Sequence, residues 1–340
     1  MSKAELYARA ASRTDEVALA AQALFGEPPS EDRWFDFFDF FCIEWVDADG
    51  WTEVERAVRE GVLPKETLRW PREVRTALWV VDGWEGEQVL LRDVATEDEV
   101  AVRAPGLEAD LPRRSVLRAR VIPEGAHHVF SGSPDVYEAM GVIARMDLHR
   151  AWCESPEPAL IARLRTLREG FHRQREERLA WVAHFGTDER VFADARALEA
   201  ELVHFVNHLL NHHRFDGRTR AESHREAKGE EPKVVQFALG PTLTGPGRPG
   251  VIFDEIEGVH FLPGYGEFAA HLRGDAEFPD VVRAYLDDPG VTTLPFRRVG
   301  ATRALADLLG VANAPMHVIL APWKDLSRRA SPSVLPGFDD

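Results

Sequence analysis

The chain has 340 residues, of which 44% are hydrophobic, a balance typical of globular proteins rather than disordered ones. Its 57 acidic and 41 basic side chains give a formal net charge of −16, which disfavours general binding to nucleic acid or to anionic membranes, because both carry the same sign. Two cysteines are too few for a disulfide scaffold or a cysteine-only zinc site. There is no signal-type segment and no uncharged run of 18 residues, so we expect a soluble, cytoplasmic protein with no membrane partner.

Residues 1–76 predict an N-terminal helical segment. An alanine-rich helix spans about residues 3 to 25 and ends before Gly26 and a pair of prolines. In the very apolar stretch 34–45, a helix places five large side chains on one stripe with i, i+3, i+4, i+7 spacing: Trp34, Phe37, Phe38, Phe41 and Trp45. Further apolar residues flank this stripe, so we expect the helix in a core; an exposed stripe would instead be a docking surface. Thr52 and Glu55 predict a capping box for a short helix.

Residues 77–133 predict a small antiparallel, barrel-like β module packed on the N-terminal segment. Short runs with a period of two occur at 77–84, 87–94, 99–103, 115–122 and 127–130, separated by glycine and acidic turns. Small barrels often bind oligonucleotides. Between residues 77 and 131, however, six arginines and no lysine face ten acidic residues, a balance of 6 − 10 = −4, and aromatic residues are few. We therefore expect no nucleic-acid partner for this module.

The remaining chain predicts three segments, which complete an α+β fold. Residues 134–215 are expected to form a helical hairpin with long helices at 159–185 and 188–213, split by Gly186. The polar stretch 216–232 is expected to be a linker. Residues 233–340 are expected to form a small α+β domain, with strands at 234–239 and 251–256 around a Gly/Pro-rich loop and a short strand at 317–320. That loop is not a phosphate-binding Walker A loop, because Pro246 and Gly247 replace its Lys and Ser/Thr.

One set of residues has metal-ligand spacing: Glu201, His204, His208 and His212. On a helix the three histidines lie along one stripe, and His-x-x-x-His is a spacing at which two imidazoles reach one Zn²⁺ or a similar ion. Three such residues span about 12 Å along the helix axis, so one ion takes only two of them. Further ligands would come from other histidines, namely His149, His172, His184 or His213. The alternative is that the histidines only flank the apolar face of the helix.

A second candidate is the carboxylate pair Asp36 and Asp39, three residues apart on the aromatic helix. If these groups are buried in apolar surroundings, their pKa values rise and one can act as a general acid. Alternatively, they mark the solvent-facing strip of the helix or pair with an arginine. The sequence contains no Gly-x-Ser-x-Gly elbow that would present a nucleophile.

Several short motifs occur in a recognisable order. The aromatic Phe-Asp-Phe-Phe helix is followed by Leu-Leu-Arg-Asp at 90–93 and Leu-Arg-Ala-Arg at 117–120, then by Phe-Leu-Pro-Gly-Tyr-Gly at 261–266 and Leu-Pro-Phe-Arg-Arg at 294–298. In this order the chain resembles a group of bacterial proteins, many of which end in a SecC-type zinc-binding motif. Because the C-terminal end of this chain has no cysteine, that zinc site does not carry over. The resemblance implies a bacterial, cytosolic protein and names no catalytic residue.

Together these observations predict a non-catalytic, cytoplasmic regulatory or protein-interaction protein with another protein as its partner and no cofactor. The prediction depends on the absence of a nucleotide loop, a catalytic triad and a complete metal motif from the sequence. The alternative is a metal-dependent enzyme or metal sensor that binds a divalent ion such as Zn²⁺ through His204, His208 and His212, with Glu201 nearby.

Overall fold

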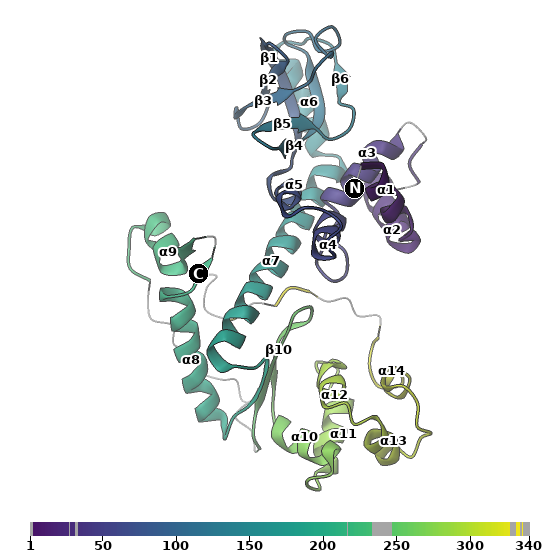
Figure 1. Cartoon of the computed structure of the whole chain (residues 1–340), viewed down its shortest axis with the longest axis vertical. Helices are drawn as coiled ribbons and strands as arrows, with labels where there is room; N and C mark the ends of the chain where they lie inside the picture. The colour runs from purple at the N-terminus through teal and green to yellow at the C-terminus, as the bar shows by residue number, and fades with distance from the viewer. Residues whose placement is uncertain are drawn as a thin grey trace. The chain divides into compact units, whose positions relative to one another are not determined.

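The computed structural model describes residues 3–26, 28–30, 33–215, 217–232, 247–326, 331–333 and 335. The chain divides into two compact units, Met1–Arg168 and Glu169–Asp340, which are described separately below. Within the described ranges, fourteen α-helices and eleven strands form a mixed α+β fold, so the predicted fold class is confirmed (Figure 1). None of the helices in these ranges is both long enough and apolar enough to cross a membrane.

Unit 1 begins with short helices, whose ends follow local sequence signals. They are α1 (Lys3–Ala11), α2 (Thr14–Phe25), α3 (Trp34–Ile43), α4 (Glu53–Arg59) and α5 (Arg69–Glu73), with the 3₁₀ helix η2 (Lys65–Leu68) before α5. Helix α2 ends at Gly26, which adopts the left-handed conformation that favours glycine, with φ of 74°. Helix α4 begins with the predicted capping box, in which the Thr52 and Glu55 side chains each accept a hydrogen bond from the other residue's backbone N–H. This prediction is confirmed.

Helix α3 is a core helix on one side only. Phe37, Phe40 and Phe41 are buried in the hydrophobic core of the N-terminal helices. Trp34 and Phe38 pack against that core but are only half-buried, and Phe35 is 70% exposed. The face that enters the core therefore contains residues 37, 40 and 41, and the predicted stripe is divided between an interior and a surface.

The strands of unit 1 form one six-stranded sheet: β1 (Arg75–Glu85), β2 (Gln88–Asp93), β3 (Glu99–Arg103), β4 (Val116–Glu124), β5 (His127–Phe130) and β6 (Asp135–Tyr137). The order is β1-β2-β3-β5-β4-β6, and β4 also pairs with β1, so the sheet curls back on itself. The predicted antiparallel barrel requires correction, because β3 and β5 run parallel and share only two residue pairs. The sheet is therefore mixed and is not a true barrel.

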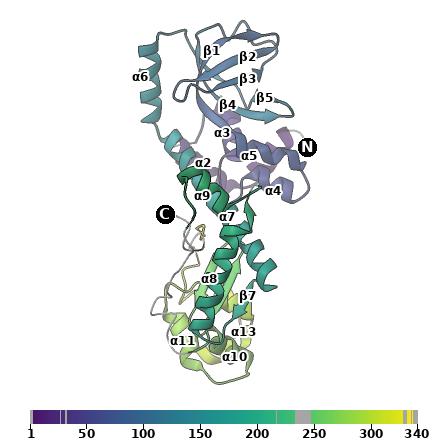
Figure 2. The same ribbon diagram turned by 90° about the vertical axis from the view of Figure 1, so that its left-hand side faces the viewer.

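Both faces of this sheet are covered, at least along β1. Trp79 and Val81 point into one apolar core with residues of β2 and β4. Leu78 and Val80 point to the other face, where side chains of α6 (Val142–Cys153) pack against them, including Leu148 and Trp152. Figure 2 shows α6 alongside the sheet. Because neighbouring side chains of a strand point to opposite faces, a strand buried on both faces is apolar at successive positions, as residues 77–81 are.

Helix α7 (Pro156–Phe185) runs through the division between the units, and its C-terminal part belongs to unit 2. There Trp181 is fully buried and packs edge-on against Phe205 of α8 (Ala195–Asn211). Between these helices the chain forms β7 (Glu189–Val191), which joins a three-stranded antiparallel sheet with β10 (Gly250–Asp254) and β11 (Gly258–Leu262). The segment predicted to form a plain hairpin thus contains a sheet strand between its two long helices.

The rest of unit 2 is mostly helical. The predicted linker contains part of a two-stranded pairing, β8 (Arg214–Phe215) with β9 (Arg218–Thr219), and α9 (Arg220–Lys228). Five helices follow the three-stranded sheet: α10 (Tyr265–Arg273), α11 (Pro279–Asp287), α12 (Leu294–Val299), α13 (Thr302–Leu309) and α14 (Met316–Leu320). The strand predicted at 317–320 is therefore wrong. The strand predicted at 234–239 and the loop up to residue 246 lie outside the described residues.

Candidate functional site

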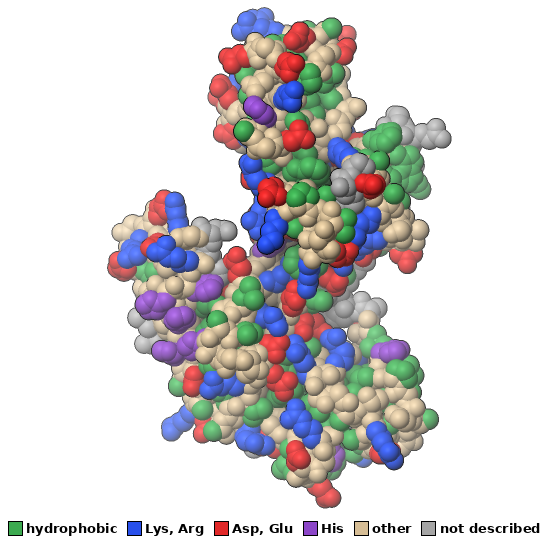
Figure 3. Space-filling view, in the orientation of Figure 1, with side chains coloured by type: hydrophobic (Ala, Val, Ile, Leu, Met, Phe, Trp, Pro, Cys, Tyr) green, Lys and Arg blue, Asp and Glu red, His purple; other side chains and the backbone are tan. Residues whose placement is uncertain are grey.

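The predicted histidine set lies on the outer side of α8. Leu198, Leu202, Phe205 and Leu209 form the buried face of this helix. His204 and His212 are exposed and His208 is half-buried, and Figure 3 shows histidine side chains gathered over α8. The His208 and His212 ring centroids are 5.4 Å apart. The histidines flank the apolar face, as one of the two interpretations expected, and they also form a continuous surface group.

His184 of α7 joins this group from a different helix. Its ring centroid lies 5.5 Å from that of His204 and 5.4 Å from that of His208. Burial lowers the pKa of His184, and the neighbouring His208 and His204 lower it further, so the neutral imidazole is favoured. Of the four additional histidines considered from sequence, His184 has a ring that packs against two members of the stripe. The four residues His184, His204, His208 and His212 are called the histidine cluster below.

Glu201, the fourth member of the predicted set, has another partner. Its Oε1 lies 3.5 Å from Nη2 of Arg190, whose guanidinium also lies over the Phe185 ring. In the part of the chain that the structure describes, no group of three or more His, Cys, Asp or Glu side chains is arranged to hold a metal ion. A metal site with three or more protein ligands therefore stays a prediction.

A second candidate site is an apolar pocket in unit 1, formed by α2, α3 and the proline pair before α3. Its volume is about 420 Å³. Most of its lining is apolar, and the two polar exceptions are Thr14 and Gln22; the full lining is Ala11, Thr14, Val17, Ala18, Ala21, Gln22, Pro28, Pro29, Trp34 and Phe38. Hydrophobic side chains are visible on this part of the surface in Figure 3. This set is called the α2–α3 pocket below.

The aromatic residues that line the α2–α3 pocket pack against the hydrophobic core. The Trp34 ring stacks on Phe38 at a centroid distance of 5.5 Å and meets the buried Phe37 edge-on at 5.7 Å. Phe35 is exposed on the same helix, and Leu19 of α2 is also exposed, so the apolar surface of these two helices is not confined to the pocket. The sequence does show more aromatic residues on α3 than one core-facing stripe needs. From periodicity alone, however, these aromatic residues were expected in a core rather than on a surface.

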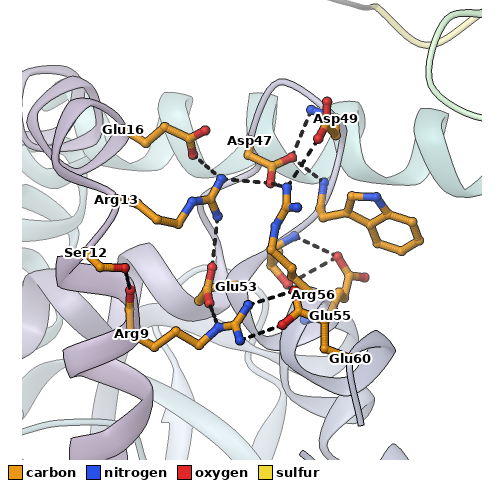
Figure 4. Close-up of polar contacts among 12 residues, drawn as sticks. Arg9, Ser12, Arg13, Glu16, Asp47, Asp49, Glu53, Glu55, Arg56 and Glu60 are labelled. Atoms are coloured by element: carbon orange, nitrogen blue, oxygen red, sulfur yellow. Dashed lines mark hydrogen bonds and ion pairs between the residues drawn. The ribbon is translucent and has the colours of Figure 1, made fainter. Parts of the chain in front are cut away.

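Buried carboxylates of unit 1 are a third candidate site, but their ion pairs with arginines have a structural role. Arg13 donates from Nη1 to Glu53 at 2.9 Å and from Nη2 to Asp47 at 3.1 Å (Figure 4). Arg9 also bonds to Glu53, and Arg56 to Asp47. The pKa of each of these arginines is raised despite burial, because the neighbouring carboxylates stabilise its charge. These ion pairs connect α1, the start of α2 and α4. Because the carboxylates in them are paired with arginines, we do not assign them a role as proton donors.

The carboxylates of α3 are paired as well. Asp36 accepts hydrogen bonds from Arg118 at 3.0 Å and from Arg120 at 3.1 Å. Burial opposes its ionisation, but these guanidiniums outweigh burial and lower its pKa, so Asp36 is a carboxylate at neutral pH. Asp39 is 1% exposed and accepts hydrogen bonds from the Lys3 ammonium and the Tyr7 hydroxyl. Of the alternatives expected from the sequence, pairing with arginine is therefore correct for Asp36. Asp39 is instead buried and bonded to a lysine and a tyrosine.

In the part of the chain that the structure describes, the histidine cluster and the α2–α3 pocket are thus two surface features whose side chains could bind a ligand. Comparison of the chain with protein-family models, curated proteins and solved structures gives no match. Function must therefore be argued from the chemistry of these sites, because a fold by itself does not specify an activity.

Proposed function

We propose that this chain is a non-catalytic binding protein of the bacterial cytoplasm, and that the α2–α3 pocket receives a large apolar side chain from a partner protein. The observation that carries the proposal is the pocket itself, a hollow of about 420 Å³ with almost wholly apolar walls. Ligand pockets are typically concave and apolar, with volumes of about 300–1,000 Å³. A contiguous exposed apolar surface in a soluble protein commonly marks an interaction site.

The composition of the pocket favours a protein segment over a small polar metabolite. Its lining contains no charged side chain, and its only polar side chains are Thr14 and Gln22. An apolar group that covers this lining removes apolar surface from water, which stabilises the complex by about 25 cal/mol per Å². An amphipathic helix that inserts a leucine- or phenylalanine-sized side chain fits this chemistry.

The pocket is also pre-organised. Trp34 and Phe38 stack on each other and pack against the buried Phe37. Their rings are therefore already ordered in the unbound protein. Ordering side chains at an interface costs about 0.5–1.5 kcal/mol per side chain, and this cost is reduced when packing has already ordered them. The proposed activity needs no cofactor.

The test uses two alanines of α2 that differ in position but not in chemistry. Ala18 is exposed and lines the pocket, whereas Ala23 is exposed on the same helix and is not part of the lining. Ala18→Arg places a long cationic side chain in the pocket without entering the core, and Ala23→Arg is the matched control. Arginine is a good helix former, so we expect both variants to keep the helix.

A library of displayed helical peptides is selected on the untagged full chain. We expect enriched peptides to carry a large apolar residue and to bind the native chain and Ala23→Arg, but not Ala18→Arg. Peptides that bind all three proteins equally, or a selection that yields no enrichment, would contradict the proposal.

A further inference from the structure

The histidine cluster brings imidazoles from two helices next to one another within unit 2, with the rings tilted by 41° to 44°. His184 comes from α7, and His204 and His208 come from α8, about twenty residues later in the chain. The ring of His184 is 5.4 Å from that of His208 and 5.5 Å from that of His204, centroid to centroid. Spacing on a single helix does not produce this cross-helix pairing.

The separation matches that of two imidazoles bound to one metal ion. A zinc–nitrogen bond is about 2.0–2.1 Å long, so a ring centroid lies roughly 3 Å from the ion, and two rings at a tetrahedral angle have centroids about 5 Å apart. The observed 5.4 Å between His184 and His208 is close to this value. The distance between the two ring centroids is therefore compatible with one shared ion.

We infer that His184 and His208 bind one divalent transition-metal ion of the borderline class, such as Zn²⁺, Ni²⁺ or Cu²⁺, at the junction of α7 and α8. Imidazole suits these ions. With two protein ligands, the remaining coordination positions are open to water or to a group from another molecule. This arrangement is compatible with the finding that the described residues hold no group of three or more metal-binding side chains.

His184 is held in place by aromatic packing. Its ring meets Phe185 edge-on at 4.6 Å and lies 5.3 Å from Phe205. Trp181, one turn earlier, is fully buried against the same Phe205. The junction between the helices is therefore well packed, and binding requires little loss of side-chain freedom.

His208 is a better second ligand than its neighbours on α8. It is half-buried, whereas His204 and His212 are exposed, so ordering its side chain costs less. His212 is also 5.4 Å from His208, but that pair belongs to one exposed helix face and includes no ring from α7. Glu201 is not part of the inferred pair, because its carboxylate would have to leave the 3.5 Å contact with Arg190 to bind the ion.

The inference is tested by calorimetric titration of the untagged full chain, because an affinity tag would add histidines of its own. We expect one Zn²⁺ per chain. His184→Ala and His208→Ala should each weaken zinc binding about tenfold or more, because each removes one of the two protein ligands. His212→Ala, and His317→Ala on the exposed side of α14, should leave the affinity within about twofold and serve as matched controls. Binding should tighten from Co²⁺ to Ni²⁺ to Cu²⁺.

A thermal melt adds a readout that does not depend on heats of binding. An ion that binds only the folded chain raises the melting temperature, so zinc should stabilise the native chain and His212→Ala but not His184→Ala. His184→Gln, which keeps a side chain of similar size at the junction, should also lose binding while retaining the native circular dichroism spectrum.

Three outcomes would overturn the inference. They are no stoichiometric zinc binding at millimolar metal, unchanged affinity in folded His184→Gln, and an affinity that falls with His204→Ala or His212→Ala rather than with His208→Ala.

Discussion

Two neighbouring phenylalanines of α3 provide a direct test of how this helix divides between interior and surface. Phe37 is 0% exposed and contacts the rings of Phe25, Trp34 and Phe41 at centroid distances of 5.7 to 6.1 Å. Phe37→Ala should therefore leave an enclosed cavity and destabilise unit 1 by about 3–5 kcal/mol, the usual cost of a buried Phe→Ala change.

Phe38 is chemically identical but half-buried, and it lines the α2–α3 pocket. Phe38→Ala enlarges a space that is already open to solvent, so little is added for a new cavity. The loss is then mainly the transfer free energy of a partly buried side chain, which is less than the about 1.5–3 kcal/mol of a fully buried one. We expect Phe38→Ala to be the milder change in stability and the more damaging one for peptide binding.

The assay is denaturant unfolding followed by far-UV circular dichroism, with peptide affinity measured separately for each folded variant. Because the chain has two compact units, the transition of unit 1 must be fitted on its own before free energies are compared. Equal destabilisation by the two changes, or a larger loss for Phe38→Ala, would refute the assignment of Phe37 to the interior and Phe38 to a surface.

Three other changes have calculable outcomes. Arg120→Met should cost about 3–5 kcal/mol in denaturant unfolding, because it leaves the buried Glu44 carboxylate without the guanidinium that bonds to it at 2.6 Å. Gly250→Ala should cost about 1–3 kcal/mol in the same assay, since its Cβ would lie 2.4 Å from the Tyr265 ring, whereas Gly83→Ala, with open space around it, should cost little. Asp36 has a folded-state pKa below 3.8, so its contribution to stability is present above that pH and is lost as the pH falls through the folded value. Melting temperatures between about pH 5 and pH 2 should therefore fall less steeply in D36N than in the native chain.

Local sequence signals predicted several parts of the fold correctly. The capping box of Thr52 and Glu55 needs only four residues to form, and the period-two runs near residues 77–130 became strands of one sheet. The strand predicted at 317–320 was wrong, because a run as short as His-Val-Ile-Leu has the same apolar pattern in a strand and in one turn of a helix. The parallel pairing of β3 with β5 was also missed, since strand direction depends on how the chain returns and not on periodicity.

The histidine cluster was also predicted from the sequence only in part. His204 and His208 lie on α8 as the i, i+4 spacing predicts for any helix, whereas His212 is the C-cap residue that follows α8. His184 was one of four possible additional ligands, and the sequence offered no reason to choose it. The choice follows from the packing of Trp181 against Phe205, which fixes where α7 meets α8.

The sequence by itself determined the α+β class and several of the elements, because caps, turns and hydrophobic periods act over a few neighbouring residues. Only the tertiary structure decided that Asp36 is bonded to two arginines more than eighty residues away, that Phe38 faces a pocket while Phe37 faces a core, and that His184 meets His208. Each of these facts depends on the position of a distant segment. That position is set by how whole elements pack, which no short window of sequence contains.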